Sequence, residues 1–373
     1  MLQETGELGQ AEAALTEGAA AAAAAGLAAV RARISVQLAE IHGMHGGPDV
    51  EALAECAAST AAATAVLDAE GDLDGLAEAW TLTGQLRFWL GESPADQDAL
   101  ERAIAYARQS GNHRAQMQAS AWLAATLLLL PVPADAAIDR AEQLLQTTDG
   151  DPWAEADLLA GLSLLYAYAG RFADAREAIA RAQSVYDRSE AKLRWATAAS
   201  LAGHMELIAG DPAAAEHHTR EAYEALRAMG ERGILSTVAG ELAEALYAQG
   251  RLDEAQRMTE EAEAAAGPGD IDAQARWRAT RAKLLARRGQ FPAALRLVDE
   301  ADALTSPTSW EVLKGGVLMA KAEVNRLAGA REEAAASLRA ALRIYENQRA
   351  APLAERAQAA LAGLTGHPGT RPA

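Results

Sequence analysis

Hydrophobic and polar positions along this chain follow a helical period, and the helical segments end at regularly spaced glycines. In the segment 309–328 the apolar side chains fall on one stripe of a helix, formed by Trp310, Leu313, Val317, Ala320 and Val324. The clearest segment ends are Gly170, Gly210, Gly250, Gly289 and Gly329, at spacings of 40, 40, 39 and 40 residues. An alanine follows each of them five positions later. A period held this well is typical of stacked supersecondary units.

The residues around each glycine predict a tight turn between two helices. Glycine adopts the left-handed backbone conformation that ends a helix at little cost. After Gly210, Asp211 can cap a new helix and Pro212 suits its first turn. The following alanine lets the second helix pack closely on the first. We call the first helix of each pair A and the second B. The A helices are expected at about 152–169, 190–209, 232–249, 272–288 and 309–328, and the B helices at about 172–187, 212–229, 252–265, 292–303 and 331–348.

The same reading extends towards both ends of the chain. Earlier hinges are expected at Gly6, at Gly46-Gly47 and at Gly91, and prolines 131 and 133 replace the glycine turn once. The predicted fold is an all-α, right-handed α-solenoid of about eight helix pairs with a period of about 40 residues, in one continuous domain over 1–366. A capping helix is expected at 353–366, with Glu355, Arg356 and Gln358 on its outer face, and a disordered tail at 367–373.

The start of the chain carries a separate expectation. The hinge at Gly6 lacks the A helix that should precede it. We therefore expect a fragment or a partner-dependent piece whose first ~25 residues are the least stable part of the array.

Composition narrows the function classes. Of the 373 residues 50% are hydrophobic, and the formal charge is −18, which argues against a general nucleic-acid binder. Cys56 is the single cysteine, so neither an internal disulfide nor a cysteine metal site is possible, and a reducing cytoplasm fits. The longest apolar runs, 19–30 and 122–132, fall short of a membrane span. We expect a cytoplasmic protein with neither membrane nor nucleic acid as a direct partner.

Helix pairs with glycine before the turn and alanine after it resemble tetratricopeptide repeats. The stretch 231–297 is similar to the C-terminal repeat region of bacterial proteins that join a class III adenylate/guanylate cyclase domain, an AAA-type ATPase module and a repeat array. Similar arrays follow the ATPase module of LuxR-type activators. The resemblance covers about 71–361 well and the first seventy residues more loosely. The chain carries neither cyclase nor ATPase motifs, and no Gly-x-x-x-x-Gly-Lys-Ser/Thr loop, so no catalytic residue transfers from those families.

What the resemblance implies is a non-catalytic scaffold for a protein or peptide partner. It would be the regulatory repeat region of a larger signalling protein of the adenylate cyclase/ATPase type, with neighbouring cyclase or ATPase domains among the partners. The alternative is a ligand- or peptide-sensing repeat module of a LuxR-type regulator. No Ser/His/Asp or Cys/His constellation stands out, so we expect no enzyme, no catalytic residues and no cofactor.

Two histidine pairs are close enough in sequence to be considered as metal ligands. His42 and His45 lie three residues apart where a helix ends, with no carboxylate close in sequence. His217 and His218 are adjacent, so their side chains are expected to point in different directions on a helix. We expect solvated surface histidines in both cases and no metal site.

Three tryptophans on predicted A helices raise another possibility. Trp195, Trp277 and Trp310 could stack on a ligand or peptide, because A helices line the concave face in repeat arrays of this type. Core packing is the favoured interpretation, since Trp277 precedes Leu284 by seven residues.

The segment 272–288 concentrates positive charge in an acidic chain. It contains Arg276, Arg278, Arg281, Lys283, Arg287 and Arg288. By helical spacing the first, fourth and fifth of these share one face, and the third and sixth share another. We favour pairing with acidic neighbours such as Glu260, Glu261 and Glu263 on the preceding B helix. The sharper alternative is a docking patch for an acidic peptide or partner domain, together with Trp277 and Trp310.

Overall fold

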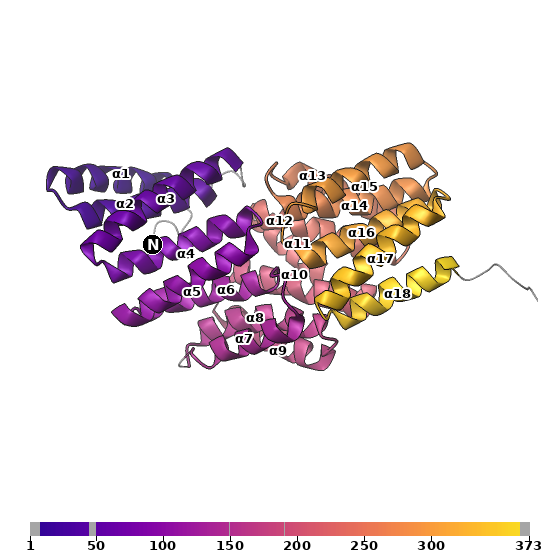
Figure 1. Cartoon of the computed structure of the whole chain (residues 1–373), viewed down its shortest axis with the longest axis horizontal. Helices are drawn as coiled ribbons and strands as arrows, with labels where there is room; N and C mark the ends of the chain where they lie inside the picture. The colour runs from indigo at the N-terminus through magenta and orange to yellow at the C-terminus, as the bar shows by residue number, and fades with distance from the viewer. Residues whose placement is uncertain (1–7, 45–49, 149, 190, 366–373) are drawn as a thin grey trace, which may run out of the picture. The chain divides into compact units, whose positions relative to one another are not determined.

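The computed structural model describes residues 8–44, 50–148, 150–189 and 191–365, and these form helices and turns without any strand. Successive helices run back and forth along the chain (Figure 1). The helices of the first part are α1 Leu8–Ala24, α2 Ala28–Met44, α3 Val50–Glu70, α4 Leu73–Trp89, α5 Ser93–Ser110, α6 His113–Leu127, α7 Ala134–Leu145, α8 Pro152–Tyr168 and α9 Phe172–Arg188. The later ones are α10 Lys192–Ala209, α11 Pro212–Met229, α12 Gly233–Ala248, α13 Leu252–Ala265, α14 Ile271–Arg287, α15 Phe291–Thr305, α16 Glu311–Leu327, α17 Arg331–Asn347 and α18 Ala351–Thr365. The predicted all-α array of helix pairs is confirmed.

The hinges have the backbone geometry that the glycine spacing predicts. Gly170, Gly210 and Gly250 have φ of 76°, 86° and 76°, in the left-handed region. At the α10–α11 hinge the side chain of Asp211 accepts a hydrogen bond from the backbone N–H of Ala214 at 3.0 Å, which caps α11. Local sequence therefore sets where each pair turns.

The alanine after each hinge does what its position predicts. These five alanines have no exposed surface, and they are Ala175, Ala215, Ala255, Ala294 and Ala334. Glycines inside helices extend the same close packing. A Cβ added at Gly203 would lie 2.3 Å from the Cγ2 atom of Thr219, and one at Gly315 would lie 2.5 Å from the ring of Tyr345. Small residues thus set how closely A and B helices approach.

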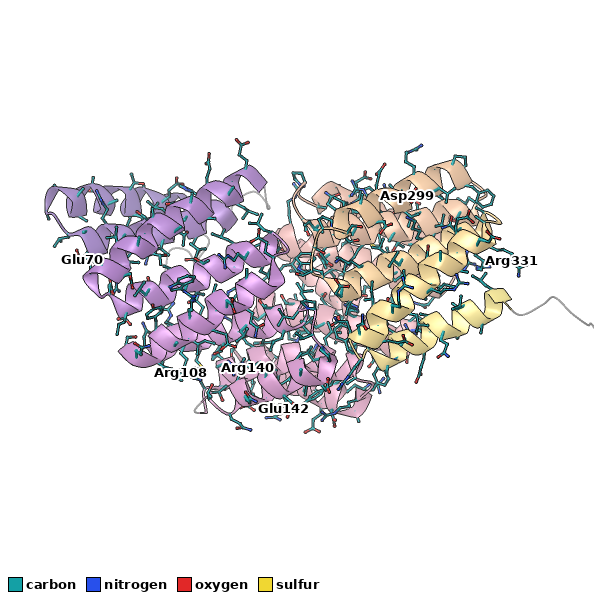
Figure 2. All side chains as sticks on the ribbon, viewed as in Figure 1. Glu70, Arg108, Arg140, Glu142, Asp299 and Arg331 are labelled. Atoms are coloured by element: carbon teal, nitrogen blue, oxygen red, sulfur yellow. The ribbon has the colours of Figure 1, made fainter. Side chains whose placement is uncertain are left out.

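A and B helices differ in how much of their surface is buried. The A helix α12 buries residues on all sides, including Val238, Leu242 and Leu246, because it packs on α10, α11, α13 and α14. The B helix α13 buries only Ala255, Thr259 and Ala262. B helices carry exposed charges, as Asp299 of α15 and Arg331 of α17 illustrate (Figure 2). The A helices therefore form the core of the array, and any charge on them is unusual.

The helices group into two compact units. Unit 1 comprises Met1–Leu130, Leu144–Leu158 and Gly267–Asp270, and unit 2 comprises Pro131–Gln143, Leu159–Ala266 and Ile271–Ala373. The single domain over 1–366 stays a prediction. The hinges at Gly6 and Gly46-Gly47, residue His45 and the tail 366–373 lie outside the described residues. Within the described part, no helix has the length and apolarity that a bilayer crossing requires.

Unit 2 is tied together by contacts between its first and last segments. The backbone N–H of Ala134 donates to the carbonyl of Gln348 at 2.8 Å, and Arg349 pairs with Asp135. Arg356 donates to the carbonyl oxygens of Leu207 and Ile208 at the end of α10. Arg356 is exposed on α18, and its guanidinium adds hydrogen bonds to carbonyl oxygens at the C-terminal end of α10.

Candidate functional site

A chain of polar side chains crosses the A helices of unit 2. We call it the A-helix network and define it by eleven residues, of which Ser200 and His204 lie on α10, Glu241, Glu244 and Tyr247 on α12, Asp272, Arg276, Thr280, Lys283 and Arg287 on α14, and Glu323 on α16. Its members contact one another across neighbouring A helices through hydrogen bonds and ion pairs. Seven of its residues carry charged groups, Glu241, Glu244, Asp272, Arg276, Lys283, Arg287 and Glu323, on helices that otherwise form the core.

Glu241 lies in a buried part of the A-helix network, with 5% of its side chain exposed. It accepts a hydrogen bond from the Ser200 hydroxyl at 2.5 Å, and the Nδ1 atom of His204 lies 3.5 Å from its other oxygen. Arg276 lies 3.9 Å away and also pairs with Asp272 at 2.8 Å. Burial alone raises the pKa of Glu241, but hydrogen bonding to His204 and the charge of Arg276 outweigh it and hold the pKa below its usual value.

Glu244 and Lys283 form a second ion pair one turn further along. The Lys283 ammonium lies 2.5 Å from both carboxylate oxygens of Glu244, and Thr280 donates to the same carboxylate at 2.9 Å. Lys283 keeps 8% of its side chain exposed, whereas Glu244 keeps 38%. Burial raises the pKa of Glu244, and the charge and hydrogen bond of Lys283 reverse that shift, so the carboxyl remains ionised. The pair is therefore buried on one side and open on the other.

Tyr247, Arg287 and Glu323 close the network at α16. The Tyr247 hydroxyl donates to Glu323 at 2.6 Å and accepts from the Nε atom of Arg287 at 2.9 Å. The Lys283 ammonium also lies 4.4 Å from the centroid of the Tyr247 ring. Arg287 is the most open cation of the network, with 47% of its side chain exposed. Together these groups offer both signs of charge on a rigid surface.

The remaining cations of the segment 272–288, of which Arg288 directly follows α14, pair with carboxylates on the B helices. Arg281 pairs with Glu263 and Arg288 with Asp253, both on α13, and Arg278 lies 3.4 Å from Glu300 of α15. The division of α14 into two charged faces is as its helical spacing predicts, and pairing with Glu263 is observed. A docking role for the six cations stays a proposal, and any acidic partner would have to compete with these carboxylates.

The tryptophans lie in the core. Trp277 is 4% exposed, and the guanidinium groups of Arg278 and Arg281 lie 4.2 Å and 4.5 Å from its ring centroid. Trp310 is 3% exposed and occupies the N-cap position before α16, so its placement within that helix is wrong. Trp195 packs in part against the cluster that contains Trp277. At these positions the three tryptophan side chains stabilise the repeats through packing.

Sequence reasoning missed the partners of the α14 cations on the neighbouring A helices. A signal was present: the position six residues before the hinge glycine is occupied by His204, Glu244, Lys283 and Glu323 in four successive A helices. Stacking brings equivalent positions of successive repeats side by side, so alternating charge at one register predicts contact. This pattern appears only when successive A helices are aligned on their hinge glycines, and it is not visible in the sequence of α14 alone.

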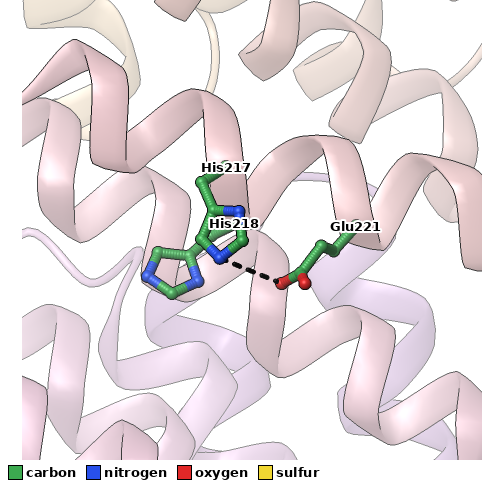
Figure 3. A group of neighbouring side chains, drawn as sticks. All are labelled: His217, His218 and Glu221. Atoms are coloured by element: carbon green, nitrogen blue, oxygen red, sulfur yellow. Dashed lines mark ion pairs between the residues drawn. The ribbon is translucent and has the colours of Figure 1, made fainter.

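Three possible metal ligands gather on α11, where His217, His218 and Glu221 each offer one ligand atom within 4.8 Å of those of the other two (Figure 3). His217 and Glu221 are exposed, and their Nε2 and Oε2 atoms lie 3.8 Å apart. The two imidazole centroids are 5.3 Å apart. The expectation that these histidines point in different directions is therefore corrected. His42 on α2 pairs with the exposed carboxylate of Glu12 at 3.0 Å.

Unit 1 contains a buried carboxyl of a different kind. Asp96 of α5 has no exposed surface, and neither of its carboxyl oxygens has a hydrogen-bond partner among the described residues. The hydroxyls of Ser120 and Thr126 on α6 are also buried without a hydrogen-bond partner within the described ranges, and Thr126 lies close enough to Asp96 to act on its pKa. Burial raises the pKa of Asp96 to about 7. Asp96 therefore takes up or releases its proton near neutral pH.

Comparison with solved structures supports the repeat assignment. Neither a protein-family model nor a curated protein matches the chain. A Rap protein in complex with the Competence and Sporulation Factor is similar over 84% of this chain and 93% of its own, at 14% identity and a TM-score of 0.50. Yeast Tom70 matches 89% of this chain at 15% identity and a TM-score of 0.49, and the chain spans 64% of the Tom70 length. At 14% identity the likeness to the Rap protein shows the fold alone, which is a tetratricopeptide-like array of helix pairs.

Proposed function

We propose that this protein is a non-catalytic scaffold that binds a protein or peptide partner through the A-helix network of unit 2. The observation that carries the proposal is the line of charge across α10, α12, α14 and α16. Ion pairs in a core stabilise a fold little compared with apolar residues of similar volume, so stability alone is a poor reason for them. Glu244 and Arg287 keep 38% and 47% of their side chains exposed, which leaves both within reach of a partner.

The chemistry of these groups defines the kind of partner. Glu244 offers a carboxylate and Arg287 a guanidinium, each already held in place by neighbours of the network. Preorganised groups lose little conformational entropy when they bind. A peptide segment that carries both signs of charge and free backbone amides matches them. The Rap structure, whose partner is the Competence and Sporulation Factor, is a fold of this kind with a bound partner.

The wider setting rests on the sequence resemblance alone. We propose that the array serves as the regulatory repeat region of a cytoplasmic signalling protein of the adenylate cyclase/ATPase type. The partner would then be a neighbouring cyclase or ATPase domain of a longer chain. Co-expression of the array with such a domain, followed by size-exclusion chromatography, tests this setting separately from the binding face.

A peptide selection tests the binding face directly. Random 12-residue peptides would be displayed, selected on the full chain and measured by fluorescence anisotropy. We expect selected peptides to lose at least about tenfold in affinity, or 1.4 kcal/mol, on the double variant Glu244→Ala/Arg287→Ala. The matched control is Asp253→Ala/Arg288→Ala, which removes an ion pair between α13 and α14, away from the network. Equal affinity for both variants would contradict the proposal, and strong thermal stabilisation by a small metabolite would favour a ligand-sensing module instead.

A further inference from the structure

His217, His218 and Glu221 on α11 form a group of side chains with the chemistry and proximity of metal ligands. In a helix, residues three and four apart face each other. Glu221 is four residues after His217 and three after His218, so one carboxylate is the common neighbour of both imidazoles. Figure 3 shows the three side chains converging on the surface of α11. Among the residues that the structure describes, this is the group in which three His, Cys, Asp or Glu side chains each place a ligand atom within 4.8 Å of the other two.

The distances are within reach of a tetrahedral site. Zinc binds imidazole nitrogen and carboxylate oxygen at about 2.0–2.2 Å, which places ligand atoms roughly 3.3–3.5 Å apart. The Nε2 atom of His217 and the Oε2 atom of Glu221 already lie 3.8 Å apart. Both side chains are exposed and can rotate to close the remaining gap. Three ligands from rigid positions on one helix need little reorganisation to bind a metal.

The surroundings keep these ligands available. Glu216, one residue before the pair, is occupied by Arg220, Gln249 and Arg251. Glu221 pairs instead with His217.

We propose that His217, His218 and Glu221 bind a divalent transition metal of the zinc class, with at least one coordination position left open. Two imidazoles and one carboxylate suit Zn²⁺, whereas Mg²⁺ and Ca²⁺ prefer oxygen ligands. The open position faces solvent and can take water or a ligand from another molecule. This site lies on a B helix and is independent of the A-helix network.

Calorimetric titration of the metal-free full chain with ZnCl₂ tests the proposal. We expect one site that loses at least about tenfold in affinity in each of His217→Ala, His218→Ala and Glu221→Gln. The matched control is His42→Ala, which removes another exposed histidine beside a carboxylate and should leave the site unchanged. Co²⁺ in place of Zn²⁺ should give the intense visible absorption of a tetrahedral nitrogen and oxygen site, and Mg²⁺ should not compete. Retention of full affinity by His217→Ala/His218→Ala, or an equal loss in His42→Ala, would overturn it.

Discussion

Two buried carboxyl groups, Asp96 in unit 1 and Glu241 in unit 2, lie in the same kind of helical array but have pKa values shifted in opposite directions. Both are almost completely hidden from solvent, with Asp96 at 0% and Glu241 at 5% exposure. Burial raises the pKa of both groups. For Glu241, His204, Ser200 and Arg276 reverse the shift, whereas Asp96 lacks a hydrogen-bond partner among the described residues. Partners, and not depth, decide whether a buried carboxyl carries charge.

The comparison separates two uses of a polar residue in an A–B array. Glu241 belongs to a network whose members fix one another across α10, α12 and α14. Asp96 destabilises unit 1 when it is ionised, because Arg87 and the groups near its carboxyl offset the cost of burying the charge only in part. We expect mutations in the two places to change stability in opposite directions.

The largest effect is expected from Glu241→Ala. It removes the acceptor of Ser200 and His204 and one of the two carboxylates near Arg276. Leaving buried polar groups unpaired should lower the free energy of unfolding by about 2–4 kcal/mol. Urea denaturation at pH 7 measures it. A loss below about 1 kcal/mol would mean that water replaces the missing carboxylate.

The substitution Asp96→Asn should act in the opposite direction. It keeps the shape of the side chain and removes the charge, so at pH 8 the free energy of unfolding should rise by about 2 kcal/mol. At pH 4 the gain should vanish, because the wild-type carboxyl is then protonated in the folded state. Thermal melts of both proteins at the two pH values measure it. Lower stability of the variant at pH 8 would show that Asp96 has a partner that stabilises its charge.

The two groups should also give opposite pH slopes. The pKa of Asp96 is raised from 3.8 to about 7, so the folded state holds the proton more tightly, and its contribution to stability is lost as pH rises from about 4 through 7. The pKa of Glu241 is lowered from 4.5, so its contribution is present above that pH and lost as pH falls through the folded pKa. Below pH 5, Glu241→Gln should therefore flatten the acid limb by about 1 kcal/mol. Melting temperatures from pH 3 to pH 8 give both slopes, and parallel curves for wild type and variant would refute the assignment.

The smallest effect is expected from Asp253→Asn. Asp253 pairs with Arg288 at 3.1 Å, but 92% of its side chain is exposed. Solvent screens such a pair, so the free energy of unfolding should change by less than about 0.5 kcal/mol. The same urea titration serves as the measurement. A change as large as that of Glu241→Ala would show that exposure does not separate the two kinds of pair.

Much of the fold could be predicted from the sequence because its determinants are local. A glycine that ends a helix and an alanine that allows close packing act within a few residues, so α11 and α13 begin and end where predicted. Local reasoning failed where a residue resembles many others. In the sequence, Asp96 resembles any acidic residue in the first turn of a helix. Only the packing of α5 and α6 buries its carboxyl away from solvent.

By itself, then, the sequence determined the all-α class, the period near 40 residues and the two charged faces of α14, since these follow from helical spacing. The tertiary structure decided which groups meet. Glu244 contacts Lys283 across 39 positions, and Arg349 contacts Asp135 across 214. Such contacts depend on the packing of whole repeats, which sets side-chain distances that no local pattern encodes. By contrast, His217, His218 and Glu221 lie within five positions of one helix, so helical spacing alone brings their side chains together.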